Sequence, residues 1–516
     1  MRAGPFVAFA CALALLHGGA AAAADRAALD RAFDDLGTRY GLPGLAIGVI
    51  EDGKIVYART GGERVAGSGA KITPQTLFKI ASNSKAMTAA ALARLVDAGK
   101  LQWDDPVVKH LPQFRMFDPW VTRNMQVRDL LVHNSGLPEG GGDLMLWPEP
   151  NAFTRADILA GLAHIKPAYG FRAGYAYDNL LYVVAGEVAA AVGAASYEEM
   201  VRREVFEPLG LGCRVGSWRS AAGDDVAQPH MRKDGRNVVL GADGERVPEI
   251  TSAAAGGIRC SLDDMLAWAR NWLAPDERQL EWLSKRQRAA MWSPRTPMPI
   301  SARRRAWENT HYYAYALGFR VADADGVWTV SHTGTLSGMY SVMMLLPDQR
   351  SGFVMMTNGE GSEARTVGTE VLLKLFTAPG DPRRVADYAA DLARDAAAPT
   401  RSRAPDTSSR VAAEPDAMRA QLGVWRDPWF GEVAICAHDG GVRFEAAKSP
   451  RLAGKVMVVG TRALVDWDSD AADVEAWLDF GTGERGATLA MAKVDPDGDF
   501  SSDYEDLAFV RVRGCD

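Results

Sequence analysis

The order in which strand-like and helix-like patterns occur is the feature that most restricts the fold of this chain. Two apolar segments joined by Asp52-Gly53 predict a β-hairpin over residues 45–57. Residues 75–310 have mainly helical patterns, and strand patterns return over residues 315–357. Strands on both sides of a helical region indicate one antiparallel sheet built from both ends of the domain, with the helices inserted as a cover. We therefore predict an α+β domain over residues 25–378.

The C-terminal part of the chain follows a different pattern. Residues 379–414 contain many Pro, Ser and Thr residues, which is typical of a linker. Short β-type segments then recur at regular spacing between residues 432 and 511, which predicts a small all-β barrel or sandwich over residues 415–516. A chain of 516 residues is also too long for one ordinary hydrophobic core, so at least two domains are expected.

The first 24 residues have the composition of a secretory signal peptide. Arg2 precedes an apolar run over residues 6–16, and three alanines at residues 22–24 provide a cleavage site. The apolar run is shorter than the ~20 residues that span a bilayer, and an uncleaved anchor is the alternative. We predict cleavage after Ala24 and a periplasmic or secreted protein that has no membrane span after cleavage.

Composition argues against several classes of partner. The chain is 47% hydrophobic and 24% charged with a net charge of −7, and it has no basic tract suited to nucleic acid or anionic membranes. The sequence contains no His-Glu-x-x-His, Walker A or Cys-x-x-Cys motif. We therefore expect no nucleic acid partner and no required metal or cofactor.

The cysteines suggest one disulfide in each domain. Of the five, Cys11 lies in the predicted signal peptide, and export permits the others to form disulfides. Cys213 and Cys260 fall in the larger domain, whereas Cys436 and Cys515 fall in the C-terminal one. One bridge per domain is the economical pairing, although four cysteines allow three connectivities and spacing does not choose between them.

Two Ser-x-x-Lys sequences could each supply a serine nucleophile. Ser68 and Lys71 lie in a Gly-rich loop, whereas Ser82 and Lys85 lie where an apolar helix pattern begins. Residues i and i+3 of a helix share one face, so Lys85 can reach the Ser82 hydroxyl, and the helix dipole favours an anion there. On its own, however, this tetrad is better explained by a helix cap and a solvated lysine.

Two further motifs change this interpretation. A Tyr-Asp-Asn sequence occupies residues 177–179, and a His-Thr-Gly sequence at residues 332–334 lies at the end of a predicted strand. Together with Ser82 and Lys85, these motifs resemble those of the β-lactamase-related serine hydrolases, which include class C β-lactamases, DD-peptidases, D-aminopeptidases and family VIII esterases. The resemblance covers about residues 27–375 and implies a β-lactamase/transpeptidase-like fold.

A serine hydroxyl is a poor nucleophile and needs a base within hydrogen-bond reach. We assign Ser82 as the nucleophile and Lys85 with Tyr177 as a coupled base. The ordinary pKa values are ~10.4 for lysine and ~10 for tyrosine, so the pKa of one of the two must be depressed by its surroundings. The sequence leaves open which of them holds the proton.

The remaining motif residues are expected to bind the substrate. By resemblance, Asn179 holds the base lysine and the substrate amide, and the backbone N–H groups of Ser82 and Thr335 form an oxyanion hole. Gly334 would let the strand approach the substrate. His332 stands where true β-lactamases and D-Ala-D-Ala carboxypeptidases usually have lysine, and a largely neutral imidazole is a weaker anion site.

A neutral residue at this position favours the aminopeptidase and esterase branches. We therefore expect an enzyme that forms a Ser82 acyl-enzyme with small amides, esters or D-amino-acid peptides. The alternatives are a β-lactamase or D-Ala-D-Ala carboxypeptidase, and a non-catalytic protein that binds peptidoglycan or peptides.

The C-terminal region has a resemblance of its own, over about residues 415–513. The sequences Trp-Arg-Asp-Pro-Trp-Phe-Gly at residues 425–431 and Tyr-Glu-Asp-Leu-Ala-Phe at residues 504–509 are similar to a lipocalin-like domain appended to some of these hydrolases. In an archaeal self-compartmentalising serine peptidase that domain assists oligomerisation and shapes access to the site. The resemblance thus makes an oligomer possible here, and the role of the domain stays open.

Overall fold

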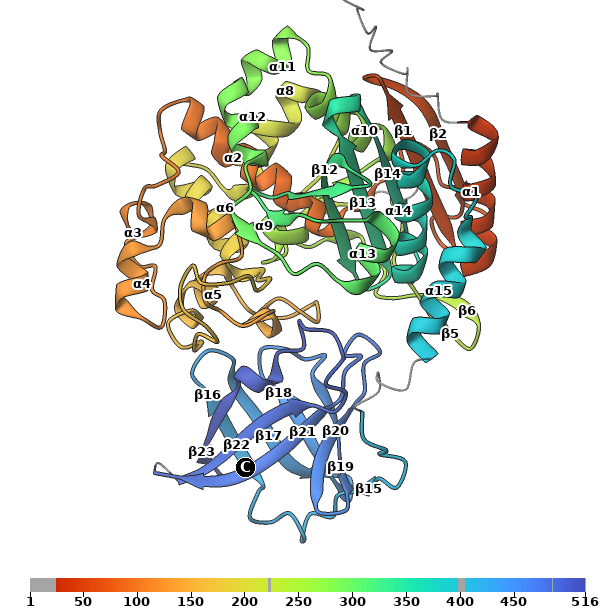
Figure 1. Cartoon of the computed structure of the whole chain (residues 1–516). Helices are drawn as coiled ribbons and strands as arrows, with labels where there is room; N and C mark the ends of the chain where they lie inside the picture. Colours follow the sequence, from red (N-terminus) through yellow and green to blue (C-terminus); the bar gives the residue numbers. More distant parts are fainter. Residues whose placement is uncertain (1–24, 221–223, 398–403, 485, 516) are drawn as a thin grey trace, which may run out of the picture.

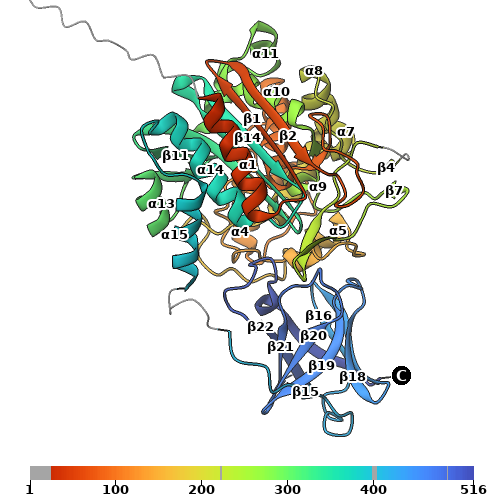
Figure 2. The ribbon, with the colours of Figure 1, turned by 90° about the vertical axis from the view of Figure 1, so that its right-hand side faces the viewer.

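The computed structural model describes residues 25–220, 224–397, 404–484 and 486–515 (Figure 1). The predicted signal peptide, residues 1–24, lies outside the described residues. A larger α+β domain lies against a smaller barrel of strands, and both views show the barrel at one end of the molecule (Figures 1 and 2). In the described ranges no single helix is long and apolar enough to cross a membrane, and the one helix pair that passes together is bent by 77°.

An eight-stranded antiparallel sheet forms the centre of the larger domain. Its first strand pairs with its last, in a register that places Leu45 opposite Thr357 and Val49 opposite Phe353. The predicted α+β fold, with one sheet built from both ends of the domain, is confirmed. In spatial order the strands are β2 (Lys54–Gly62), β1 (Gly44–Glu51), β14 (Ser351–Thr357), β13 (Met339–Leu346), β12 (Val327–Leu336), β11 (Arg320–Ala324), β10 (Tyr313–Tyr315) and β9 (Thr296–Pro297).

Helices cover both faces of this sheet, because its central strands are apolar on both sides. Side chains of β1 alternate between the two faces of the sheet. Ile47 packs in the core formed with α1, α14 and α15, the helices in front of β1 and β14 in Figure 2. Ala46 and Ile50 pack in the core on the other face, with α2 and α10. The helices are α1 (Arg26–Tyr40), α2 (Ser84–Asp97), α3 (Val107–His110), α4 (Pro119–Asn124), α5 (Arg155–Gly161), α6 (Leu180–Gly193), α7 (Tyr197–Val201), α8 (Glu207–Leu209), α9 (Ala253–Gly256), α10 (Leu262–Leu273), α11 (Glu277–Trp282), α12 (Lys285–Trp292), α13 (Ala302–Glu308), α14 (Ser362–Thr377) and α15 (Val385–Ala397).

Part of the predicted linker is helical. Within residues 379–414, α15 buries Val385, Tyr388, Ala389 and Leu392 in the same core as α1 and α14. This spacing of three and four residues is that of an amphipathic helix, and most of the Pro, Ser and Thr residues that predicted a linker follow it. The larger domain therefore continues past residue 378 to the end of α15.

The C-terminal strands form a closed antiparallel barrel of the predicted all-β type. Successive strands pair with their neighbours, and β19 pairs with β20, which closes the sheet and removes its free edges. Trp425, Val433 and Phe444 are among the buried side chains that fill it. The strands are β16 (Gly423–Asp427), β17 (Gly431–His438), β18 (Gly441–Ala446), β19 (Ala453–Val459), β20 (Arg462–Trp467), β21 (Ala476–Gly483), β22 (Gly486–Lys493) and β23 (Ala508–Arg513), and β15 (Val411–Ala412) pairs with β19 outside the ring.

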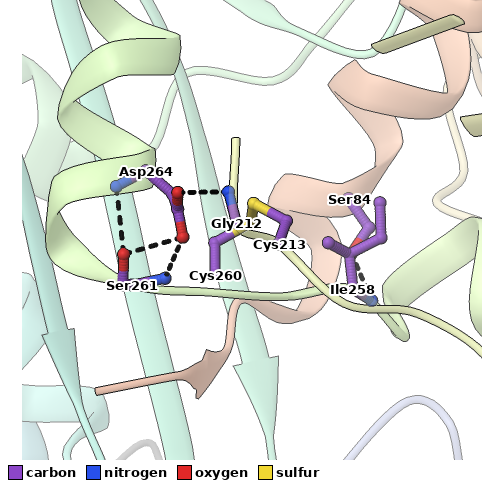
Figure 3. The surroundings of a disulfide bond; sticks show 7 residues. All are labelled: Ser84, Gly212, Cys213, Ile258, Cys260, Ser261 and Asp264. Atoms are coloured by element: carbon purple, nitrogen blue, oxygen red, sulfur yellow. Dashed lines mark hydrogen bonds between the residues drawn. A yellow bond between two sulfur atoms is a disulfide. The ribbon is translucent and has the colours of Figure 1, made fainter. Parts of the chain in front are cut away.

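Both predicted disulfides are formed, Cys213–Cys260 and Cys436–Cys515. The first joins the loop after α8 to β8 (Arg259–Cys260), which pairs with β3 (Phe78–Lys79). Close to this bridge, the backbone N–H of Ile258 donates to Ser84 Oγ (Figure 3). The distance between the two atoms is 3.1 Å. The disulfide therefore braces the segment that supports the start of α2. Two further short ribbons pair β4 (Trp218–Arg219) with β7 (Arg246–Val247) and β5 (His230–Lys233) with β6 (Arg236–Val239).

Candidate active site

Ser82 lies in a single 3-10 turn (Ala81–Asn83) between β3 and α2. Ala81 has a left-handed backbone conformation, with φ 49°, which costs a residue with a Cβ about 1–3 kcal/mol. The turn is tied to β13 on both sides of Ser82, because Asn83 Nδ2 donates to Ser341 Oγ and Ser341 Oγ donates to the Ile80 carbonyl, each at 2.8 Å. These contacts hold the turn that carries Ser82.

Lys85 lies one helical turn further on and is fully buried. Its Nζ is 3.1 Å from Ser82 Oγ, 2.7 Å from Asn179 Oδ1 and 2.8 Å from the Ala255 carbonyl oxygen. Burial lowers the pKa of Lys85 to about 7, although the carboxylates of Asp143 and Asp178 oppose this shift. Near neutral pH the amine can therefore be unprotonated and accept a proton.

Tyr177 is 7% exposed, and its hydroxyl lies near that of Ser82. Lys85 Nζ lies 4.9 Å from the centroid of its ring. Burial raises the pKa of Tyr177 above its ordinary value of 10, and a nearby guanidinium and the Ser82 hydroxyl oppose the shift. The ring of His133 packs against that of Tyr177 with a centroid distance of 4.2 Å. Of the two predicted bases, Lys85 therefore has the depressed pKa, and Tyr177 keeps its proton.

His332 is fully buried and does not line the pocket that contains Ser82. Its Nδ1 lies 2.7 Å from the Thr333 carbonyl oxygen, and its Nε2 lies 2.7 Å from the Tyr315 hydroxyl. A carbonyl only accepts, so Nδ1 carries the hydrogen and Nε2 accepts from tyrosine. Burial also lowers the pKa of His332 well below 6.5, so the imidazole is neutral. The structure thus buries the His332 side chain of β12 against Tyr315, outside the lining of the pocket.

Gly334 and Thr335 bring β12 up to the Ser82 turn. A Cβ on Gly334 would lie 2.2 Å from the Ile80 carbonyl oxygen and 2.3 Å from Ser341 Oγ. The glycine is therefore needed for the contact between strand and turn, and not only for the predicted approach of a substrate. Thr335 is exposed in the pocket wall, and Arg365 Nη1 donates to its Oγ1 at 2.6 Å and to the Gly334 carbonyl at 2.7 Å.

Arg320 is a pocket residue that the sequence motifs do not mark. It lies on β11 opposite Ser331 of β12, and its Nη1 donates to Thr333 Oγ1 at 2.6 Å. Its guanidinium lines the pocket together with Ser82, and it has no ion pair among the described residues. Only the register of β11 against β12 brings this cation to the site, so a sequence pattern around residue 320 could not reveal it.

The second Ser-x-x-Lys sequence does not form a comparable pair. Ser68 Oγ donates to the Val65 carbonyl at 2.7 Å, and Lys71 Nζ pairs with Glu63 at 3.1 Å. Neither Ser68 nor Lys71 lines the pocket, whereas Ser82 does. The sequence context had favoured Ser82 over Ser68 in the same way.

The pocket around Ser82 has a volume of about 690 Å³ and is lined by both domains. The larger domain contributes Ser82, Tyr177 and Asn179, and aromatic walls that include Trp147 and Trp218. The barrel contributes Leu452, Phe500 and Ser501. A cavity of this size accommodates a drug-sized molecule or a short peptide.

An antiparallel sheet covered by helices, with a serine and a buried lysine at the start of the central helix, defines a β-lactamase/transpeptidase-like protein. The chain belongs to the β-lactamase family, whose model matches residues 29–376. A class C β-lactamase from Rhodobacter sphaeroides has a similar structure, with a TM-score of 0.53, 20% identity and coverage of 68% of this chain and 99% of that one.

Other similar proteins differ in how much of each chain is matched. An unguisins hydrolase of Aspergillus campestris is 28% identical over 66% of this chain and 62% of its own length. Penicillin-binding protein 4 of Amycolatopsis lactamdurans is 26% identical over 73% of this chain and 99% of its own length. An octameric penicillin-binding protein homologue from Pyrococcus abyssi matches 94% of this chain and 99% of its own, with a TM-score of 0.58 and 19% identity, so its fold includes both domains.

Proposed function

We propose that the protein is an exported serine hydrolase that forms an acyl-enzyme on Ser82. Its proposed substrates are small amides and esters or D-amino-acid peptides. The observation that carries this proposal is the 3.1 Å distance from Ser82 Oγ to the Nζ of a fully buried Lys85 with a depressed pKa. The two disulfides are consistent with the proposed export, because they persist in oxidising compartments.

In the acylation step, neutral Lys85 accepts the Ser82 proton as Oγ bonds to the substrate carbonyl carbon. The carbonyl electron pair moves to oxygen, where the backbone N–H groups of Ser82 and Thr335 are proposed to receive the charge, each contributing ~3 kcal/mol. Tyr177 gives its proton to the leaving nitrogen or oxygen, the bond to the carbonyl carbon breaks, and Lys85 returns the proton to Tyr177.

In deacylation a water attacks the acyl carbon, and its proton passes to Lys85 through Tyr177. The bond between the acyl carbon and Ser82 Oγ then breaks, and Lys85 returns the proton to Oγ. The enzyme is restored, and the products are the acid and the amine or alcohol.

A second candidate function is favoured by Arg320. Its guanidinium lines the pocket without an ion pair in the described part of the chain, and arginine binds carboxylates by paired hydrogen bonds. A cation at this place offsets the neutral His332, so a β-lactamase or D-Ala-D-Ala carboxypeptidase, whose substrates carry a carboxylate, is the alternative.

Turnover of three chromogenic substrates tests these functions. The mature protein is compared with Ser82→Ala and with Ser68→Ala, a matched control in the other tetrad. We expect turnover of p-nitrophenyl butyrate or D-alanyl-p-nitroanilide that Ser68→Ala retains and Ser82→Ala loses. Faster turnover of nitrocefin than of the other two would support the second candidate. Turnover of none of them, together with binding of peptidoglycan peptides, would support a non-catalytic binding protein.

A further inference from the structure

The loop between β22 and β23 of the barrel lies against the larger domain. Asp503 is buried in this loop, and its carboxylate accepts from the backbone N–H of Gly142 at 2.5 Å and from that of Leu144 at 3.0 Å. These two bonds hold the turn that carries Asp143, although Asp143 and Asp503 are 360 positions apart in the sequence. The barrel therefore fixes one segment of the pocket wall.

A second contact from the same loop reaches the side chain of Asp143. Ser501 Oγ donates to Asp143 Oδ2 at 2.7 Å, and Asn179 Nδ2 donates to the same oxygen at 2.8 Å. Asn179 Oδ1 in turn accepts from Lys85 Nζ at 2.7 Å. Asp143 and Lys85 are both fully buried. A continuous path of hydrogen bonds thus runs from the barrel to the proposed base.

The path determines which way the Asn179 amide faces. Asp143 Oδ2 accepts hydrogen bonds, so it faces the NH₂ group of Asn179 and directs the Asn179 carbonyl oxygen to Lys85. A neutral Lys85 then donates its two hydrogens to Asn179 Oδ1 and to the Ala255 carbonyl, which leaves its lone pair for the Ser82 proton. With the amide reversed, its NH₂ group would compete for that lone pair.

The loop also contacts Tyr177, the proposed proton donor to the leaving group. The ring of Phe500 meets the ring of Tyr177 edge to face at a centroid distance of 5.8 Å. The Phe500 backbone lies so close to Gly140 that a Cβ there would be 2.5 Å from the Phe500 carbonyl oxygen. The barrel loop therefore packs against Tyr177 as well as against Asp143.

We propose that Asp143 is a positioning residue, held by Ser501 and Asp503 of the barrel, that orients Asn179 so that the lone pair of Lys85 faces Ser82. The barrel is then part of the catalytic site and not an independent module. This inference rests on the proposed function, because it assigns Lys85 the role of base.

The charges around Asp143 give the proposal a pH signature. Lys85 from α2, Asp178 before α6 and Asp503 from the barrel face this carboxyl group. Burial raises the pKa of Asp143, while the hydrogen bonds from Ser501 and Asn179 and the charge of Lys85 favour its ionised form. The ionised carboxylate raises the pKa of Lys85. Removing this carboxylate therefore moves the deprotonation of Lys85 to lower pH.

The test is the rate at which a fluorophosphonate probe labels Ser82, measured from pH 5 to pH 10. In this reaction Ser82 Oγ bonds to phosphorus, fluoride leaves and Lys85 takes the proton. We expect Asp143→Asn to label about 10- to 100-fold more slowly at high pH, with its acid limb moved to lower pH. The labelling rate of Ser501→Ala should be about ten-fold lower than that of the wild type. Ser501→Thr keeps the hydroxyl and should recover most of the lost rate.

The control is Thr482→Ala, which removes an exposed hydroxyl from β21 of the same barrel and should label like the wild type. If Asp143→Asn and Ser501→Ala label at the wild-type rate with an unchanged acid limb, the positioning role is wrong, whereas the proposed function is unaffected. A lower rate in Ser501→Ala that Ser501→Thr does not recover would also overturn the positioning role. Absence of label on Ser82 in the wild type would instead contradict the proposed function itself.

Discussion

At the residue scale, the proposed reaction depends on burial acting oppositely on two neighbouring groups. Burial disfavours the charged form of any side chain, so it lowers the pKa of Lys85 to about 7 and raises that of Tyr177. The result is a neutral amine beside a protonated phenol near neutral pH. One group can then accept the Ser82 proton while the other supplies a proton to the leaving group.

The depressed pKa of Lys85 predicts the acid limb of the pH profile. Lys85 is neutral above its pKa, so kcat/KM should rise as the pH increases through about 7. Lys85→Arg keeps the charge at every pH and should lose about 10²- to 10⁴-fold in kcat. Stopped-flow or plate assays with an ester across this range check both statements. An acid limb near pH 10 would show that the lysine has an ordinary pKa.

Arg320 predicts a preference that depends on substrate charge. Arg320→Gln should lower kcat/KM for a carboxylate-bearing substrate by about 10- to 100-fold, because a charge-assisted hydrogen bond contributes roughly 1.5–3 kcal/mol. The methyl ester of the same substrate serves as the matched comparison and should change much less. Equal losses for the acid and its ester would mean that Arg320 only supports β12 through Thr333.

At the scale of elements, the site is made by the contact of β12 with the turn before α2. The strand comes from the end of the domain and the turn from its beginning, and the antiparallel pairing of β1 with β14 brings the two ends together. Close backbone approach is possible because Gly334 has no Cβ. The disulfide Cys213–Cys260 braces the other side of the same turn.

Gly334→Ala should separate the strand from the turn. Its Cβ would lie 2.2 Å from the Ile80 carbonyl oxygen, so either β12 or the Ser82 turn has to move. A shift of about 1 Å at reacting atoms costs on the order of 10²-fold in rate. Gly380→Ala is the control, since nothing lies within 4 Å of a Cβ there. Steady-state kinetics that leave kcat unchanged in Gly334→Ala would contradict this role.

Removing the Cys213–Cys260 bridge should lower the free energy of unfolding by about 2–4 kcal/mol. The bridge closes a loop with a sequence separation of 47 residues, and such closure restricts the unfolded chain. The measurement is urea unfolding of the Cys213→Ser/Cys260→Ser variant, followed by tryptophan fluorescence. The Cys436→Ser/Cys515→Ser variant, which opens the barrel bridge, is the comparison and should leave Ser82 labelling closer to the wild-type rate.

At the scale of the whole molecule, two domains share one pocket. The fold of each domain could be predicted from the sequence, because the hydrophobic periodicity of a strand or a helix is visible within a short segment. In the larger domain, the order of the three motifs along the chain supported the same prediction. Ser82 and Lys85 are three residues apart, so helix geometry alone predicts their contact.

Other parts of the site depend on contacts that no local pattern records. Arg320 reaches the pocket through the register of two strands, and Ser501 reaches Asp143 across the domain interface. His332 was expected to bind the substrate because its motif resembles the one in which related hydrolases carry lysine, whereas the structure buries its side chain against Tyr315. The strand period gives the spacing of side chains but not which face looks into the pocket.

The position of a covalent label tests directly whether Ser82 is the nucleophile. The mature protein, Ser82→Ala and Ser68→Ala are treated with a fluorophosphonate probe, digested and mapped by mass spectrometry. We predict a single labelled peptide that contains Ser82 in the wild type and in Ser68→Ala, and no label in Ser82→Ala. Labelling that persists in Ser82→Ala, or that appears on Ser68, would contradict the assignment of Ser82 as the nucleophile.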